Sequence, residues 1–181
     1  MFTKDIVYIA GIDPGGNTGL SIIGLNPMTL SIESIETYVF VLDSYSTETN
    51  LVNRLETIDK IIYWLIEKYQ PKMIGMESAF LNVRYPKAII TLSSYTTMLE
   101  YCINKYGIYT ELIKYPPKYI KKIICSGDAN KDDMMTGVGS ILEISNKMDV
   151  GSKTEHEIDA TAIAYVVIQE IRNYPYVLYK I

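Results

Sequence analysis

This sequence has few cysteines, a single histidine and no long apolar run. Its two cysteines, Cys102 and Cys125, are far apart and form neither a pairing nor a zinc-binding pattern, which predicts a chain that works in a reducing compartment. No apolar stretch approaches the roughly 18 residues that a bilayer span requires, and the first residues lack the basic-then-apolar layout of a secretion signal. We therefore expect a cytoplasmic protein with no membrane partner.

An excess of positive charge is also lacking. The formal net charge is −4, which argues against a protein that coats nucleic acid indiscriminately but leaves room for a local basic face. What the sequence does have is an ordinary globular balance, with 48% hydrophobic and 21% charged residues. Its length of 181 residues predicts one domain, spanning residues 1–181.

Apolar periodicity predicts a regular order of strands and helices. The expected strands are 5–12, 18–25, 31–42, 72–78 and 108–115, and the expected helical segments are 49–69, 85–106, 117–125, 131–145 and 154–171. A "PGGN" turn joins the first two strands into a hairpin. Three meandering strands followed by strand–helix units predict an α/β fold, with helices on both faces of a mixed five-stranded sheet.

Two acidic residues stand at predicted strand ends. Asp13 closes the first strand, "VYIAGID", and Glu77 closes the fourth, "MIGME". If these strands are neighbours, their backbones lie about 4.7–4.9 Å apart, and the two carboxylates repel unless they share a proton or a cation. Oxygen ligands of this kind suit Mg²⁺. The alternative is that each acid caps a helix or ends a strand in solvent.

A third acid lies in the segment "EHEIDATAIA". His156, the single histidine, and Asp159 are three residues apart and therefore share one face of a helix. The alanines after Asp159 would let this helix pack closely against a sheet. His156 either belongs to the same site as the acids or is a surface or capping residue. Glu155 and Glu157 fall elsewhere around the helix, where we expect them to be solvated.

Three segments in this order resemble the RuvC-type Holliday junction resolvases: "GIDPGGNTG", "GMES" and "HEIDATAIA". The resemblance runs from about residue 7 to 168 and includes "ESAF" and the lysine-bearing stretch "PPKYIKKIICSGDANKDDM". "GIDPG" alone also occurs in actin-like kinases and chaperones, so the ordered combination carries the resemblance. It implies a ribonuclease-H-like fold and a phage or bacterial member, working in the cytoplasm of a bacterium or a phage-infected cell.

The resemblance also implies an activity. Such an enzyme is a metal-dependent, structure-selective endonuclease that resolves four-way DNA junctions by paired symmetric nicks, with two Mg²⁺ ions for which Mn²⁺ can substitute. Asp13, Glu77 and Asp159 match the family's metal-binding catalytic acids. His156 matches a position that is aspartate in some members and histidine in others, and is expected to share both roles.

DNA contacts are expected beyond the acids. Phe80 falls on an aromatic residue that contacts the opened junction in relatives, and Lys121 and Lys131 fall near lysines that contact the DNA backbone. Residues 105–131 carry six lysines and two acidic residues, which predicts a local basic face, although a solvated helix face is the alternative. The full set of predicted DNA-binding residues is Phe80, Arg84, Lys118, Lys121, Lys122 and Lys131. Tyr115 and Tyr119 could stack on unpaired bases.

Two symmetric nicks in a two-fold junction call for a two-fold homodimer. The predicted helix 85–106 is expected to provide part of the interface, unless its apolar residues belong to the core; these are Ile89, Ile90, Leu92, Met98 and Leu99. Two other functions remain open. One is a different ribonuclease-H-like nuclease acting on flaps, other branched DNA or RNA–DNA hybrids, and the other is an inactive protein that binds branched DNA.

Overall fold

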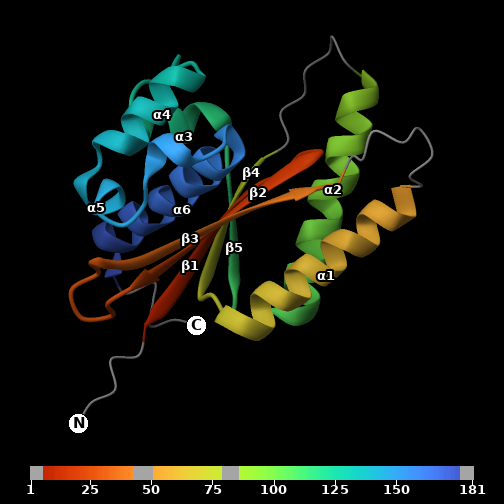
Figure 1. Cartoon of the computed structure of the whole chain (residues 1–181). Helices are drawn as coiled ribbons and strands as arrows, with labels where there is room; N and C mark the ends of the chain where they lie inside the picture. Colours follow the sequence, from red (N-terminus) through yellow and green to blue (C-terminus); the bar gives the residue numbers. More distant parts are fainter. Residues whose placement is uncertain (1–5, 43–50, 79–85, 176–181) are drawn as a thin grey trace.

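The computed structural model describes residues 6–42, 51–78 and 86–175, and in the last range it describes side chains from residue 90 onward (Figure 1). The strands are β1 (Val7–Asp13), β2 (Asn17–Leu25), β3 (Ile32–Val41), β4 (Met73–Glu77) and β5 (Glu111–Tyr115). They form one sheet in the order β3-β2-β1-β4-β5. The first three strands pair antiparallel, whereas β4 is parallel to both β1 and β5. The predicted mixed five-stranded sheet is confirmed.

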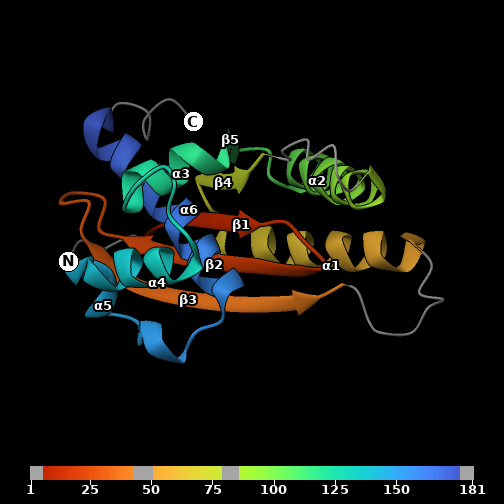
Figure 2. The same ribbon diagram turned by 90° about the horizontal axis from the view of Figure 1, so that it is seen from above.

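Helices cover both faces of this sheet (Figures 1 and 2). On one face lie α1 (Leu51–Tyr69) and α2 (Pro86–Tyr106), and on the other lie α3 (Pro117–Ile124), α4 (Lys131–Ser140), α5 (Leu142–Ser145) and α6 (Glu155–Asn173), with the short 3₁₀ helix η1 (Val150–Ser152) before α6. None of the helices in the described ranges is long and apolar enough to cross a membrane.

One predicted helix is wrong, because the structure has two shorter helices in its place. The expected helix 131–145 is divided into α4 and α5 at Ile141, whose backbone is extended with ψ of 103°. The residues before the break, Gly139 and Ser140, form helix poorly, and glycine is the weaker of the two. Apolar periodicity continues across the break, which is why the pattern alone did not reveal it.

The sheet is buried on both faces. Successive side chains of a strand point to opposite sides, so Ile9 of β1 packs with α6 whereas Ala10 and Ile12 pack with α1 and α2. In β4, Met73 joins the α6 side and Ile74 joins the α1–α2 side. This two-sided burial explains why β1 reads as a continuous apolar run.

Helix α6 lies unusually close to the sheet because glycines leave room for its backbone. A Cβ atom added at Gly11 would come within 2.1 Å of the carbonyl oxygen of Ala160, and one added at Gly19 would come within 2.0 Å of the carbonyl oxygen of His156. At Gly75 an added Cβ would lie 2.7 Å from the Val167 side chain. The expected close packing of this helix on the sheet is confirmed.

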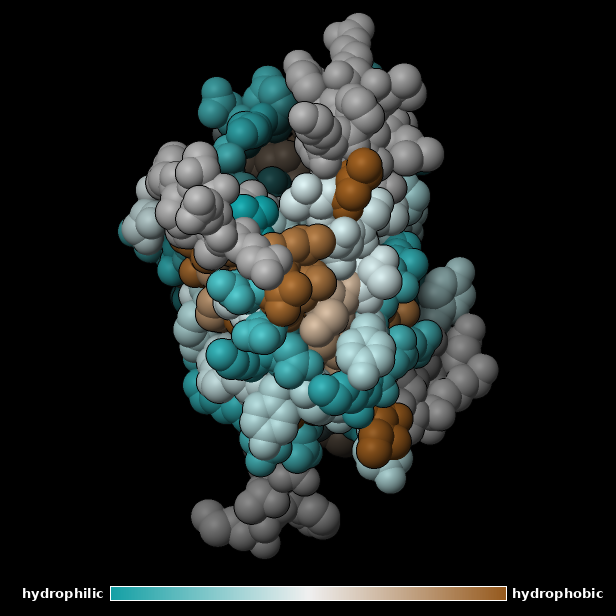
Figure 3. Space-filling model, turned by 90° about the vertical axis from the view of Figure 1, so that its right-hand side faces the viewer, coloured by the Kyte–Doolittle hydropathy of each residue, from teal (hydrophilic) through white to brown (hydrophobic). Residues whose placement is uncertain are grey.

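Helices α1 and α2 have core residues on their inner side and exposed apolar residues on their outer face. Leu99 is 1% exposed and belongs to the core, so its predicted role in a dimer interface is wrong; α2 uses it to pack on the sheet and on α1. Ile90, by contrast, is 68% exposed. Ile89 lies outside the described side chains. Figure 3 shows this face, where apolar side chains emerge between hydrophilic ones.

Candidate active site

Parallel pairing of β1 and β4 brings Asp13 and Glu77 to the same edge of the sheet. Ile12 pairs with Met76, so the next residue of each strand is an acid. Alternation along β1 and β4 sends both acids to the face on which α6 packs, the same face as Gly11 and Gly75. The condition for bringing the two acids together, that their strands are neighbours, is met.

The N-terminal part of α6 supplies the other two predicted site residues. Thr154 and Glu157 form a capping box that starts the helix at Glu155, which places His156 and Asp159 one turn apart. Nδ1 of His156 lies 3.1 Å from Oδ2 of Asp13, and these two side chains are 26% and 18% exposed. Because β2 has Gly19 opposite Asp13, no side chain stands between the strand and the histidine.

Burial and mutual repulsion raise the pKa values of the three acids. Burial raises the pKa of Asp13 to about 6; the hydrogen bond from His156 opposes this, and the charge of Asp159 adds to it. Burial, then the charges of Asp13 and Asp159, raise the pKa of Glu77 to about 7, against the lowering effect of Lys121. The pKa of Asp159 is also raised, first by burial and then by Glu155. The three carboxylates therefore act as one coupled anionic cluster.

The chemistry of this cluster fits a divalent cation. Three carboxylates and an imidazole are donors that such ions accept. The pKa values of the three acids are raised first by burial and then by nearby carboxylates, and a bound cation would offset both effects. Within the described ranges, no three histidine, cysteine or acidic side chains are gathered tightly enough to form a finished set of ligands.

Two of the predicted DNA-binding lysines border the acids. Nζ of Lys121 donates to the carbonyl oxygen of Ala129 at 2.6 Å, and the lysine charge lowers the pKa values of Glu77 and Asp159. Lys131 is exposed and pairs with Glu155. Both lysines therefore lie beside the cluster, and the charge of each lowers the pKa of Asp159.

Of the four remaining residues predicted to contact DNA, the structure describes two. Lys118 and Lys122 are exposed on α3, the helix that also carries Lys121. Phe80 and Arg84 lie outside the described residues.

The expected basic face of residues 105–131 is smaller than its lysine count suggests. Lys105 pairs with Asp59 at 3.3 Å and Lys114 pairs with Glu100 at 2.9 Å, both on the side of the sheet that α1 and α2 cover. The charges of these two lysines are paired with carboxylates far from the acid cluster. The basic surface near the site therefore comes from α3 and α4.

The prediction that Tyr115 stacks on bases is wrong. Tyr115 is 4% exposed, and its hydroxyl donates to Glu170 at 2.6 Å. The Tyr119 ring stacks on Tyr115 with centroids 5.7 Å apart, and its hydroxyl donates to the same carboxylate. A strand residue that alternation turns inward cannot serve a surface role, however basic its sequence neighbours are.

The expectation that Glu157 is solvated is also wrong. Its side chain is 12% exposed and accepts hydrogen bonds from Thr37 of β3 at 2.6 Å and from Lys153 at 3.2 Å. Burial favours a higher pKa, but the hydrogen bonds from Thr37 and Thr154 outweigh it and lower the pKa of Glu157 to about 2. The T-x-x-E spacing of a capping box was the signal that could have found this residue.

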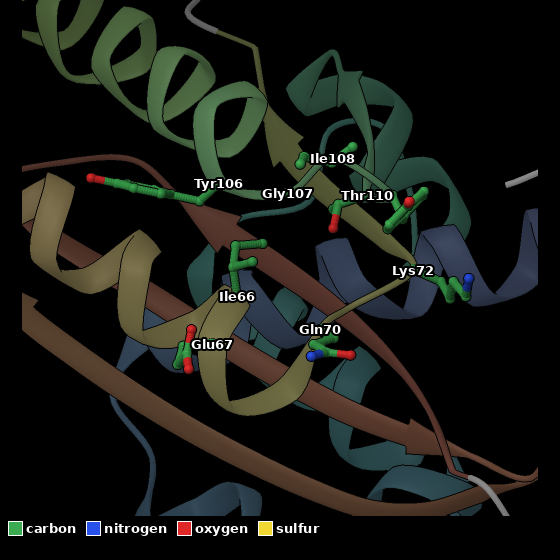
Figure 4. A pocket seen from close by; sticks show the side chains of 9 residues that line it. Ile66, Glu67, Gln70, Lys72, Tyr106, Gly107, Ile108 and Thr110 are labelled. Atoms are coloured by element: carbon green, nitrogen blue, oxygen red, sulfur yellow. The ribbon is translucent and has the colours of Figure 1, made fainter.

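Asp159 borders a small cavity. The cavity beside Lys131, Glu155 and Asp159 has a volume of about 150 Å³, below the several hundred Å³ typical of small-molecule sites. A larger cavity of about 390 Å³ lies at the opposite end of the sheet, between the end of α1 and the turn from α2 to β5 (Figure 4).

Comparison with known proteins agrees with this arrangement. The family model described as "Crossover junction endodeoxyribonuclease RuvC" matches residues 9–167. A protein of that name from Treponema denticola is 30% identical over 175 residues, covering 92% of this chain and 90% of the relative. Another, from Orientia tsutsugamushi strain Boryong, is 29% identical over 170 residues, covering 92% and 99%.

Solved structures agree on the fold. The chain resembles Thermus thermophilus RuvC in complex with a Holliday junction substrate, with a TM-score of 0.70 at 18% identity over 93% of this chain and 96% of the other. It also resembles the yeast mitochondrial Holliday junction resolvase, with a TM-score of 0.63 at 16% identity over 96% and 84%. The fold is therefore ribonuclease-H-like, and the chain belongs to the RuvC family of crossover junction endodeoxyribonucleases.

Proposed function

We propose that this protein is an endonuclease that resolves four-way DNA junctions by paired symmetric nicks, in the cytoplasm of a bacterium or a phage-infected cell. One observation carries the proposal: two strand ends and one helix, distant in the sequence, deliver Asp13, Glu77, His156 and Asp159 to one coupled cluster. Metal dependence is a property of the family. The proposal adds that the metal is Mg²⁺, that two ions act together, and that Mn²⁺ can replace them.

The arrangement of the cluster supports distinct roles for its members. Asp13 is the central residue, because it neighbours Glu77 across the sheet and contacts His156 on α6. Asp13, Glu77 and Asp159 would hold the ions, and His156 would bind one of them or orient the attacking water. When bound, the ions supply an activated water and neutralise the departing 3′ oxygen.

The lysines of α3 and α4 would hold the DNA backbone beside the acids. Lys121 and Lys131 lie beside the cluster, and the exposed Lys118 and Lys122 extend this surface along α3. Phosphate contacts of this kind position the substrate without reading its sequence. Phe80 and Arg84, which follow Glu77 in the chain, remain part of the proposal through the family resemblance.

A homodimer would use the face formed by α1 and α2. There, Ile90 and Tyr101 are 68% and 57% exposed, and with Leu55 and Met98 they line an open apolar groove of about 630 Å³. An apolar surface of this kind is typical of an interface. Two copies related by a two-fold axis would present two sites to a two-fold junction.

Cleavage of four-way junctions, flaps and RNA–DNA hybrids tests the proposal, each substrate being incubated with Mg²⁺ and then with EDTA. We expect symmetric nicks in the four-way junction with Mg²⁺ and none with EDTA. Asp13→Asn should abolish cleavage while leaving DNA binding and the thermal unfolding temperature close to those of the wild type. Cleavage of flaps or hybrids alone would replace the proposed substrate, and wild-type cleavage by Asp13→Asn would overturn the assignment of the site.

A further inference from the structure

The two lysines beside the acid cluster are held by unlike partners. Nζ of Lys121 donates to a neutral acceptor, the Ala129 carbonyl oxygen. Nζ of Lys131 donates to a charged acceptor, Oε2 of Glu155. The charge of Lys121 is thus left available by its contact, whereas the charge of Lys131 is already matched by a carboxylate. A phosphate that approaches Lys131 must compete with Glu155.

Glu155 has a second neighbour at the site. Its other oxygen, Oε1, lies 3.7 Å from Nε2 of His156, which is longer than a hydrogen bond. The other ring nitrogen, Nδ1, lies 3.1 Å from Asp13. The imidazole therefore stands between two carboxylates, in contact with one and just out of reach of the other.

The position of Glu155 allows it to serve either neighbour. It is the first residue of α6, so the capping box of Thr154 and Glu157 fixes its backbone while its side chain stays 43% exposed. The Lys131 side chain is 76% exposed. Exposed pairs of this kind are weak and exchange readily.

We propose that Glu155 is a positioning residue that changes partner when DNA binds. A backbone phosphate takes Lys131, and the released carboxylate accepts a hydrogen bond from Nε2–H of His156, in the tautomer that leaves Nδ1 unprotonated and able to bind a metal. Histidines that bind metals commonly donate their other ring N–H to a carboxylate, which fixes the ring and strengthens its hold on the ion. Substrate binding would thereby complete the site. This inference rests on the proposed function, since it takes a DNA phosphate as the ligand of Lys131 and a metal as the ligand of His156.

The first test is Glu155→Gln, which keeps the size of the side chain and removes its charge. Junction binding in EDTA should tighten about twofold to fivefold, because a weak competitor for Lys131 is lost. In cleavage assays the Mg²⁺ concentration at half-maximal rate should rise about tenfold. A structural role alone would not give tighter DNA binding together with a higher Mg²⁺ requirement for cleavage.

The second test is Lys131→Met, which frees Glu155 without DNA. Mn²⁺ binding to the DNA-free protein, measured by electron paramagnetic resonance, should tighten several-fold. The double variant Lys131→Met, Glu155→Gln should lose this gain. Asp132→Asn is the matched control, since it removes one charge next to Lys131 on the same helix turn; it should leave both the cleavage rate and Mn²⁺ affinity unchanged.

Unchanged DNA affinity in Glu155→Gln, or unchanged Mn²⁺ affinity in Lys131→Met, would overturn the inference. An effect of Asp132→Asn equal to that of Glu155→Gln would also overturn it, because general charge would then explain both. Failure of the proposed function looks different, since the wild type itself would not cut the four-way junction.

Discussion

The two faces of the sheet are covered in opposite ways. On one face, α6 approaches so closely that its backbone touches the positions of Gly11 and Gly19. On the other face, α1 and α2 fill the space with large side chains such as Ile58, Leu65 and Tyr95. The helix that carries His156 and Asp159 is the one that packs through small residues. Close backbone contact leaves little freedom for sliding, whereas large side chains can repack, so the face that holds the chemistry is the more constrained one.

Disturbing the close packing of α6 at Gly19 should have the largest effect on the cleavage rate. Gly19→Ala would place a Cβ 2.0 Å from the His156 carbonyl oxygen, so the first turn of α6 must shift. A misplacement near 1 Å can lower a rate by about a hundredfold, and we expect a loss of that order in single-turnover junction cleavage.

Gly139→Ala is the control for Gly19→Ala, because a Cβ there would meet Val150 at an ordinary 3.7 Å. This variant should cleave at the wild-type rate. Wild-type cleavage by Gly19→Ala would show that the close packing of α6 does not position the site.

The opposite face should affect stability without affecting chemistry. Leu65 is fully buried between α1 and the sheet, and Leu65→Ala should lower the free energy of unfolding by about 2–5 kcal/mol. Urea denaturation measures this loss. At temperatures where the variant is folded, its rate per folded molecule should match that of the wild type, and a large loss of rate would show that the faces are coupled.

The dependence of stability on pH separates the acid cluster from Glu157. The folded-state pKa values of Asp13 and Glu77 are raised to about 6 and about 7 from 3.8 and 4.5, so between these limits the metal-free folded protein binds more protons than the unfolded chain. Its free energy of unfolding should therefore fall as the pH rises from about 4 to 7. The pKa of Glu157 is lowered to about 2 from 4.5, so its contribution is lost as the pH falls through that range.

Thermal unfolding in EDTA and in Mg²⁺ measures this contrast. Mg²⁺ should raise the unfolding temperature more at pH 7.5 than at pH 5, because protons and the cation compete for the same carboxylates. An equal effect of Mg²⁺ at both pH values would argue against cation binding by the cluster.

The smallest expected effect is at the hydrogen bond between Glu157 of α6 and Thr37 of β3, which anchors the helix to the sheet. Glu157→Gln keeps the shape of the side chain but weakens its hydrogen bonds with Thr37, Lys153 and Thr154. Loss of such a cap costs about 1 kcal/mol of stability, to be measured by denaturation at pH 7. If the variant were as stable as the wild type at pH 7, and the two proteins lost the same amount of stability between pH 7 and pH 3, the carboxylate would have no anchoring role.

Much of the site was predictable because it depends on short-range patterns. Asp13 and Glu77 could be placed at strand ends because apolar runs stop there, and His156 and Asp159 could be placed on one face because helix spacing is regular. Whether the first and fourth strands are neighbours was left open by the sequence and is shown by the sheet order β3-β2-β1-β4-β5. The break at Ile141 and the burial of Glu157 were missed, because each depends on contacts that apolar periodicity does not record.

The sequence by itself determined the strands, most of the helices and the acids that meet at one sheet edge, since alternation and helical periodicity are local properties of the chain. Only the tertiary structure decided which charged and aromatic residues stay available to a ligand. Lys105, Lys114 and Tyr115 lie in the same basic stretch as Lys121, yet Asp59, Glu100 and Glu170 from other parts of the chain occupy them. The availability of a side chain depends on its partners in space, and those partners are fixed by packing between segments far apart in the sequence.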